Sequence, residues 1–278
     1  MGPLRAELLK AWRSWATTIL IAIVALVELL LGYLLIWLIL QAPLEEGGVT
    51  ELERAALFAT LGPDQLVGNA LSMLAGLGGA LALVLGALMS AREYGWRTVA
   101  TLLVQGRTRV TMIAAKAVAL ALVLAVMTVA VFLAAIAGSA LVAALEGGEM
   151  GLPPIDELAA GLGVGWLIVG AWGSIGLALG FLLRATGLAI GLGLAYAFVI
   201  ETLVAALSGA SSVVEAIARG LIGVNAGALA SSFGPELPAQ FGGPVLEIAP
   251  AVAALVVSAY LVAGLVVATV VIRARDVT

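Results

Sequence analysis

The sequence contains no cysteine and no histidine, and only 11% of its 278 residues are charged. The first two absences remove thiol nucleophiles, disulfides, imidazole bases and the usual zinc and haem ligands. A soluble domain of this size needs roughly 25% charged residues to cover its surface. The shortage of charge therefore indicates that most of the surface faces lipid, and we do not expect soluble enzyme chemistry on this chain.

Long apolar runs take the place of the missing charge, and 63% of the residues are hydrophobic. A hydrocarbon core of about 30 Å requires roughly 20 residues of helix. We therefore predict an all-α integral membrane protein, with residues 1–278 forming a single transmembrane domain of six helices. The predicted spans lie at about residues 17–40, 67–90, 112–144, 159–182, 186–207 and 248–272.

The connections between the predicted spans differ greatly in length. The third span is longer than a bilayer requires, and we expect it to project from the membrane. A tight turn at Arg184 separates the fourth and fifth spans, whereas residues 208–247 form a long segment with a short helix at 211–222. Small residues four positions apart allow helices to pack closely, within one subunit or between two. Such pairs are Gly161/Gly165, Gly176/Gly180 and Gly187/Gly191.

The amino-terminal residues predict an interfacial amphipathic helix over residues 3–16. Its apolar face is formed by Leu4, Leu8, Ala11, Trp12 and Trp15. Its polar face is formed by Glu7, Lys10, Arg13 and Ser14. Two tryptophans and a basic face fit a helix in the headgroup region, although a basic overhang before the first span is the alternative. The first apolar run is too long for the core of a signal peptide.

The distribution of positive charge predicts the topology. All lysines and arginines except Arg54 and Arg219 fall on one side of the predicted spans or at its edge. Because these residues resist translocation, this side is predicted to be cytoplasmic. The protein is thus expected in the cell membrane, as a multi-pass protein with both termini in the cytoplasm.

Two acidic residues, Glu28 and Glu201, fall inside the first and fifth predicted spans. A carboxylate inside a span costs several kcal/mol unless it is paired, protonated or hydrated, which makes each residue a candidate for the lining of a substrate pathway. The alternatives are a structural hydrogen bond to a neighbouring helix, or a protonated glutamate that faces a cavity and has no role. By contrast, Ser174 lacks the first glycine of a nucleophile elbow and any histidine base, so we expect it only to pack.

The segment between the second and third spans has an apolar strip where a wholly polar loop is common. An amphipathic helix fits residues 94–104, and Glu93 and Arg97 are four positions apart and can pair. The strip consists of Trp96, Val99, Leu102 and Leu103. Such a strip either rests on the membrane surface or docks into a groove on a partner protein.

Nearly the whole chain resembles the permease subunit of type 2 ABC exporters. The resemblance rests on the amino-terminal amphipathic helix, on Arg92-Glu93-Tyr94-Gly95 through Leu102-Leu103, on Arg107-x-Arg109 with Lys116 entering the third span, and on the closing Arg273-Ala274-Arg275-Asp276. Six spans, the short fourth-to-fifth turn and the long segment before the sixth agree with it. One departure is Gln105-Gly106, which stands where the family often has a Ser-Pro-like pair.

The resemblance implies a pathway formed with a second permease copy or a homologue, above two copies of a separate ABC ATPase subunit. The helix around residues 93–104 would be the coupling helix in a cleft of the ATPase, which the amino-terminal helix would also touch, and residues 208–247 would form short external helices. The ATPase-coupling residues would be Glu93, Tyr94, Trp96, Arg97, Val99, Leu102 and Leu103.

Hydrolysis would take place on the partner chain. The sequence has no phosphate-binding G-x-x-x-x-G-K-[ST] loop, so ATP and Mg would bind only to the ATPase. We expect no catalytic residue, cofactor or metal on this chain, and no nucleic-acid partner. One alternative is an ion- or proton-coupled secondary transporter that uses Glu28 and Glu201 as carriers. Another is a membrane scaffold that does not transport.

Overall fold

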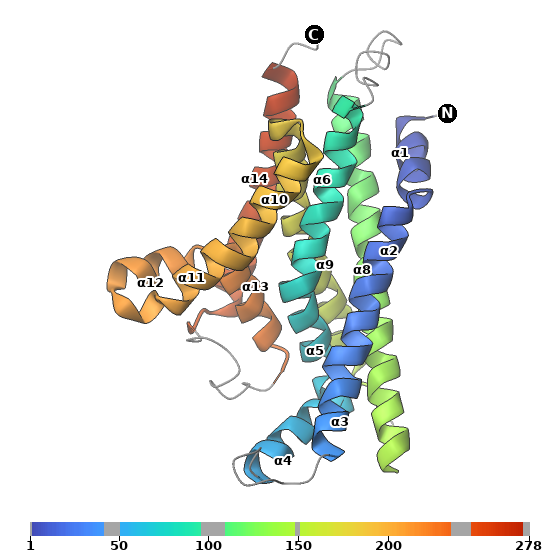
Figure 1. Ribbon diagram of the computed structural model, residues 1–278, viewed down its shortest axis with the longest axis vertical. Coiled ribbons are helices and arrows are strands. Elements are labelled where there is room, and N and C mark those ends of the chain that lie inside the picture. Colours follow the sequence, from blue (N-terminus) through green and yellow to red (C-terminus); the bar gives the residue numbers. More distant parts are fainter. Residues whose placement is uncertain (1, 42–50, 96–108, 148–150, 235–245, 275–278) are drawn as a thin grey trace.

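The computed structural model describes residues 2–41, 51–95, 109–147, 151–234 and 246–274 (Figure 1). Within these ranges the chain is helical apart from short connections, and it contains no strand. The helices form an elongated bundle with one projection at mid-height (Figure 1). The predicted all-α class is confirmed.

Six helical stretches are long and apolar enough to cross a membrane, as predicted. The first consists of α2 (Trp15–Val27), η1 (Glu28–Leu34) and α3 (Leu35–Gln41). The second consists of η2 (Pro63–Gln65), α5 (Leu66–Met73), η3 (Leu74–Gly78) and α6 (Gly79–Gly95). The third, fourth and sixth are α8 (Arg109–Glu146), α9 (Ile155–Leu183) and α14 (Pro250–Ala274). The fifth consists of α10 (Thr186–Ala195), η4 (Tyr196–Ile200), α11 (Glu201–Ala206) and the short η5 (Ser208–Ala210).

Among the described residues, four further helices lie outside these stretches. They are α1 (Pro3–Trp12), α4 (Glu51–Thr60), α12 (Ser212–Arg219) and α13 (Ile222–Ser231). The sequence predicted α12 as one helix ending near residue 222, but the helix ends at Arg219 and a second one follows. The two axes differ by 72°, with the break at Gly220 and Leu221. Ser211 begins α12 as an N-cap, because its side chain accepts the N–H of Val214.

The fourth span, α9, lies at the centre of the bundle and packs against both α6 and α14. Its glycines make this contact close: a Cβ at Gly176 would collide with the backbone of Leu83, and one at Gly180 with Ser90 on α6. Gly161 and Gly165 likewise pack on side chains of α5 and α8. These two pairs therefore pack within the subunit. Around Gly187 and Gly191 on α10, by contrast, the described part of the chain leaves open space.

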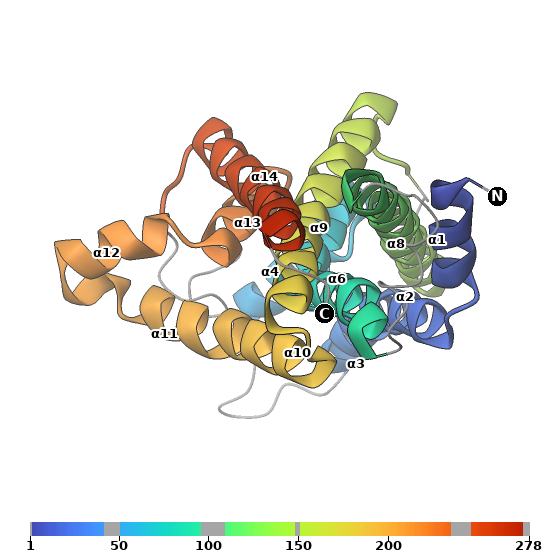
Figure 2. The same ribbon diagram turned by 90° about the horizontal axis from the view of Figure 1, so that it is seen from above.

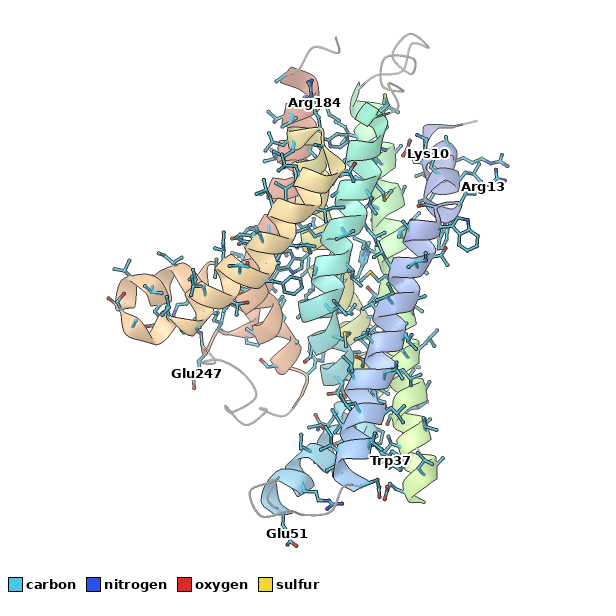
Figure 3. All side chains as sticks on the ribbon, viewed as in Figure 1. Lys10, Arg13, Trp37, Glu51, Arg184 and Glu247 are labelled. Atoms are coloured by element: carbon cyan, nitrogen blue, oxygen red, sulfur yellow. The ribbon has the colours of Figure 1, made fainter. Side chains whose placement is uncertain are left out.

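The two ends of the bundle differ in charge. The helix α1, the end of α14 and the turn at Arg184 lie at one end (Figures 1 and 3). Arg184 makes the predicted tight turn with a left-handed backbone, φ 54°, and its N–H bonds to Gly180. At the opposite end, Glu146 closes the 38-residue helix α8 by accepting hydrogen bonds from Trp37 and Gln41 at 2.8 and 2.9 Å (Figure 3). This length confirms the long third span.

Candidate functional site

The first candidate site joins α1 to the third span. Lys116, in the second turn of the predicted span, is 3% exposed, and its Nζ lies 2.8 Å from Oε2 of Glu7. The other oxygen of Glu7 lies 2.6 Å from Nζ of Lys10, one turn along α1. Burial raises the pKa of Glu7, but attraction to the two lysines outweighs it and holds that pKa below its ordinary value. The carboxylate therefore stays charged and pins α1 to α8.

This contact corrects the predicted faces of the amino-terminal helix. Glu7 was placed on the polar face, but it is 9% exposed and turns inward beside Ala11, which is 4% exposed. Trp12, on the predicted apolar face, is 48% exposed and does not pack inward with Ala11. Glu7 turns inward because Lys116, 109 positions later in the sequence, is buried and requires a partner of opposite charge. The helix also ends at Trp12, so Trp15 belongs to the first span.

The second candidate site surrounds Glu28 in the middle of the first span. Glu28 is 1% exposed and begins the π-helical turn η1. Its carboxyl group lies along its own helix beside Gly32, four residues later. A Cβ added to Gly32 would lie 3.2 Å from Oε2 of Glu28. Oε1 has no hydrogen-bond partner within the described ranges, and neither has the buried hydroxyl of Tyr33, whose ring packs on Gly138 of α8. The absence of a partner argues against a structural hydrogen bond, and it leaves a pathway residue and a protonated glutamate without a role as the two interpretations.

The third candidate site surrounds Glu201 in the fifth span. Glu201 is 5% exposed and directly follows the π-helical turn η4. Its Oε2 accepts the N–H of Gly223, 2.8 Å away, at the second residue of α13. The first N–H groups of a helix have no partner inside it and carry the positive end of the helix dipole. The carboxyl of Glu201 therefore gives one of these N–H groups of α13 an acceptor, and it joins the fifth span to the broken helix.

Two further polar side chains hold the break between α12 and α13. The hydroxyl of Tyr260 on α14 donates to the carbonyl of Gly220 at 3.0 Å. The amide of Asn225 donates to the carbonyls of Arg219 and Leu221 at 2.9 and 2.7 Å. The break is thus fixed from the fifth span, from the sixth span and from α13 itself. Sequence analysis missed Tyr260 and Asn225, although a polar residue within an apolar run was a usable signal.

The structure does not bring the two predicted pathway residues together. Glu28 lies in the first span beside α8, whereas Glu201 begins α11, which lies on the other side of α6 from the first span in both views (Figures 1 and 2). Both border a π-helical turn, a feature that is frequent at functional sites. Glu201 also has the structural hydrogen bond that was one of the alternative interpretations, whereas the described part of the chain gives Glu28 no such partner.

A family model described as "Protein of unknown function (DUF2705)" matches residues 66–278. The chain belongs to the DUF2705 family. The matched DUF2705 region holds Lys116, Glu201 and the broken helix, whereas α1 and Glu28 precede it. A search of curated proteins found no match.

The predicted coupling residues of this DUF2705 member lie mostly outside the described residues. Glu93 and Tyr94 fall in the last turn of α6. The remainder, outside the described residues, are Trp96, Arg97, Val99, Leu102 and Leu103. The described flanks, the end of α6 and the start of α8, lie at the same end of the bundle as α1 (Figure 1). The described ranges hold no group of three metal-ligating side chains, and Ser174 is buried and bonded to the carbonyl of Ala171.

Proposed function

We propose that this protein is the membrane-spanning permease subunit of an ABC exporter, coupled to a separate ATPase and assembled with a second permease copy. The observation that carries the proposal is the arrangement at one end of the bundle. There, α1 is tied to α8 by the Glu7–Lys116 ion pair, and the segment between α6 and α8 enters the same helix α8. A displacement of that segment by a bound partner would therefore move α8 directly and α1 through the ion pair.

Three further features support the proposal. Lysines and arginines gather at the end that holds α1 and Arg184, which favours a cytoplasmic position for both termini. The open glycine face of α10 at Gly187 and Gly191 leaves space for the close approach of another helix, as a second permease copy requires. The broken helix α12–α13 interrupts the apolar chain between the fifth and sixth spans, where irregular backbone is tolerated beside protein or water.

The test is co-purification of the tagged chain from its native membrane in mild detergents, followed by mass spectrometry. We expect a P-loop ATPase in the wild-type sample and its loss in Leu102→Glu. The matched control is Leu152→Glu, an exposed leucine in the connection before α9. Absence of an ATPase in several detergents, or equal loss in both variants, would overturn the proposal.

A second candidate function is favoured by the unpartnered carboxyl of Glu28. A buried carboxyl of this kind can carry a proton or cation through a gradient-driven transporter. This candidate predicts flux in proteoliposomes without ATP, driven by a pH or sodium gradient and lost in Glu28→Gln. The ABC proposal predicts no such flux until the ATPase and ATP are added.

A further inference from the structure

The exposed face of α1 has basic and apolar side chains but no acidic one, because Glu7 is buried against Lys116. Successive helical residues turn by about 100°, so Arg5, Leu9, Trp12 and Arg13 fall within an arc of about 100°. All four are exposed. The only acid of α1, Glu7, points the other way and is neutralised against Lys116 and Lys10. The exposed arc therefore carries positive charge that no acidic side chain of α1 offsets.

Aromatic side chains lie beside these arginines. Trp12 is 48% exposed and Trp15, at the start of the first span, is 82% exposed. Exposed tryptophans at the end of a span settle at the level of the lipid headgroups, where a ring has an apolar body and a polar N–H. Arg13 points away from the bundle, toward the surroundings of α1 (Figure 3). Arg13 therefore stands next to two tryptophans that are suited to the headgroup level, and Arg5 lies two turns earlier on the same arc.

We propose that α1 is a binding surface for anionic phospholipid headgroups, formed because Glu7 is buried against Lys116. Arginine suits this role since its planar guanidinium binds phosphate oxygens through two parallel hydrogen bonds. A protein partner with an acidic surface would also meet the two arginines, but exposed Trp12 and Trp15 favour lipid. The inference does not depend on the ABC proposal, because it concerns the lipid next to α1 whether or not an ATPase binds.

The test uses the tryptophans as reporters of lipid contact. The full chain is reconstituted in phosphatidylcholine bilayers that contain brominated phosphatidylglycerol or brominated phosphatidylcholine, and the quenching of fluorescence is measured. The contribution of Trp12 and Trp15 is the difference between the wild type and the Trp12→Phe, Trp15→Phe variant. We expect stronger quenching by the anionic lipid, with a preference that falls about fivefold for each arginine removed in Arg5→Gln and Arg13→Gln.

Three further variants distinguish a loss of lipid binding from a general loss of structure. Leu9→Glu places an acid on the outward arc and should reduce the preference for the anionic lipid, whereas Leu9→Gln should retain it. Arg219→Gln removes a charge from α12 and should leave the preference unchanged. Equal quenching by both lipids in the wild type, or an equal effect of Arg219→Gln, would overturn the proposal. Retained lipid preference in Arg5→Gln and Arg13→Gln with loss of a co-purifying ATPase would also overturn it, and would assign this face to protein.

Discussion

The carboxylate of Glu201 accepts the backbone N–H of Gly223 at 2.8 Å, which joins the fifth span to the first turn of α13. The contact also leaves no space at the Cα of Gly223. A Cβ added to Gly223 would collide with Oε2 of Glu201, so only glycine leaves room for the carboxylate. This pair stabilises the start of α13, since one of the N–H groups that the helix itself leaves without a partner finds an acceptor on the fifth span.

Gly223→Ala should displace the carboxylate of Glu201 and break this hydrogen bond. A hydrogen bond contributes about 1 kcal/mol, so the unfolding temperature in detergent should fall measurably. Gly227→Ala is the matched control, because Gly227 lies on the same helix with open space where its Cβ would stand. Equal unfolding temperatures for the two variants would contradict the assigned role of Gly223.

Tyr260→Phe should destabilise the protein by about 1 kcal/mol, because it leaves the carbonyl of Gly220 without its side-chain donor. The control is Tyr33→Phe, which removes a buried hydroxyl that has no partner in the described ranges and should be neutral or stabilising. Thermal unfolding of the two variants in the same detergent gives the comparison. A larger loss in Tyr33→Phe would show that its hydroxyl has a role that the structure does not give it.

Glu7→Gln should be strongly destabilising, by about 3 kcal/mol, because it removes a charged partner from the buried Lys116. The control is Glu215→Gln, which breaks the exposed pair with Arg219 on α12 and should cost at most about 0.5 kcal/mol. Urea or thermal unfolding in detergent measures both values. Similar losses in the two variants would mean that the Glu7–Lys116 pair contributes no more than a surface pair.

The same ion pair predicts a dependence of stability on pH. The pKa of Glu7 in the folded protein is below its ordinary value of 4.5, so the unfolded chain binds the proton more tightly. The stabilisation is therefore complete well above pH 4.5 and is lost as the pH falls through the lower, native pKa of Glu7. In Glu7→Gln this part of the pH dependence should disappear. A variant curve parallel to that of the wild type would contradict this assignment.

Gly176→Ala should separate α9 from α6, because its new methyl group would meet the backbone of Leu83, which cannot move aside as a side chain can. Overpacking of this kind costs about 1–3 kcal/mol. Gly187→Ala, on the open face of α10, is the matched control and should leave monomer stability unchanged. If Gly187→Ala changes only the association of two copies, the open face is an interface between them.

Much of the fold could be predicted because membrane spans depend on local composition. The six spans, the length of α8 and the turn at Arg184 all followed from the lengths of apolar runs and the residues between them. The candidate sites were predicted less well. Glu28 and Glu201 stood out as acids within apolar runs, but their partners did not, because Gly223 is 22 positions from Glu201 and no local pattern marks it.

By itself, the sequence determined that the chain is a bundle of membrane-spanning helices, since hydropathy and helix length are properties of each segment alone. Only the tertiary structure decided which way Glu7 points, where the helix after residue 211 breaks, and which glycine pair stays open. Each of these depends on neighbours from other helices: Lys116 for Glu7, Tyr260 and Glu201 for the break, and α5, α6 and α8 for the glycine pairs of α9. Such pairings arise when distant segments pack, and helical periodicity carries no information about them.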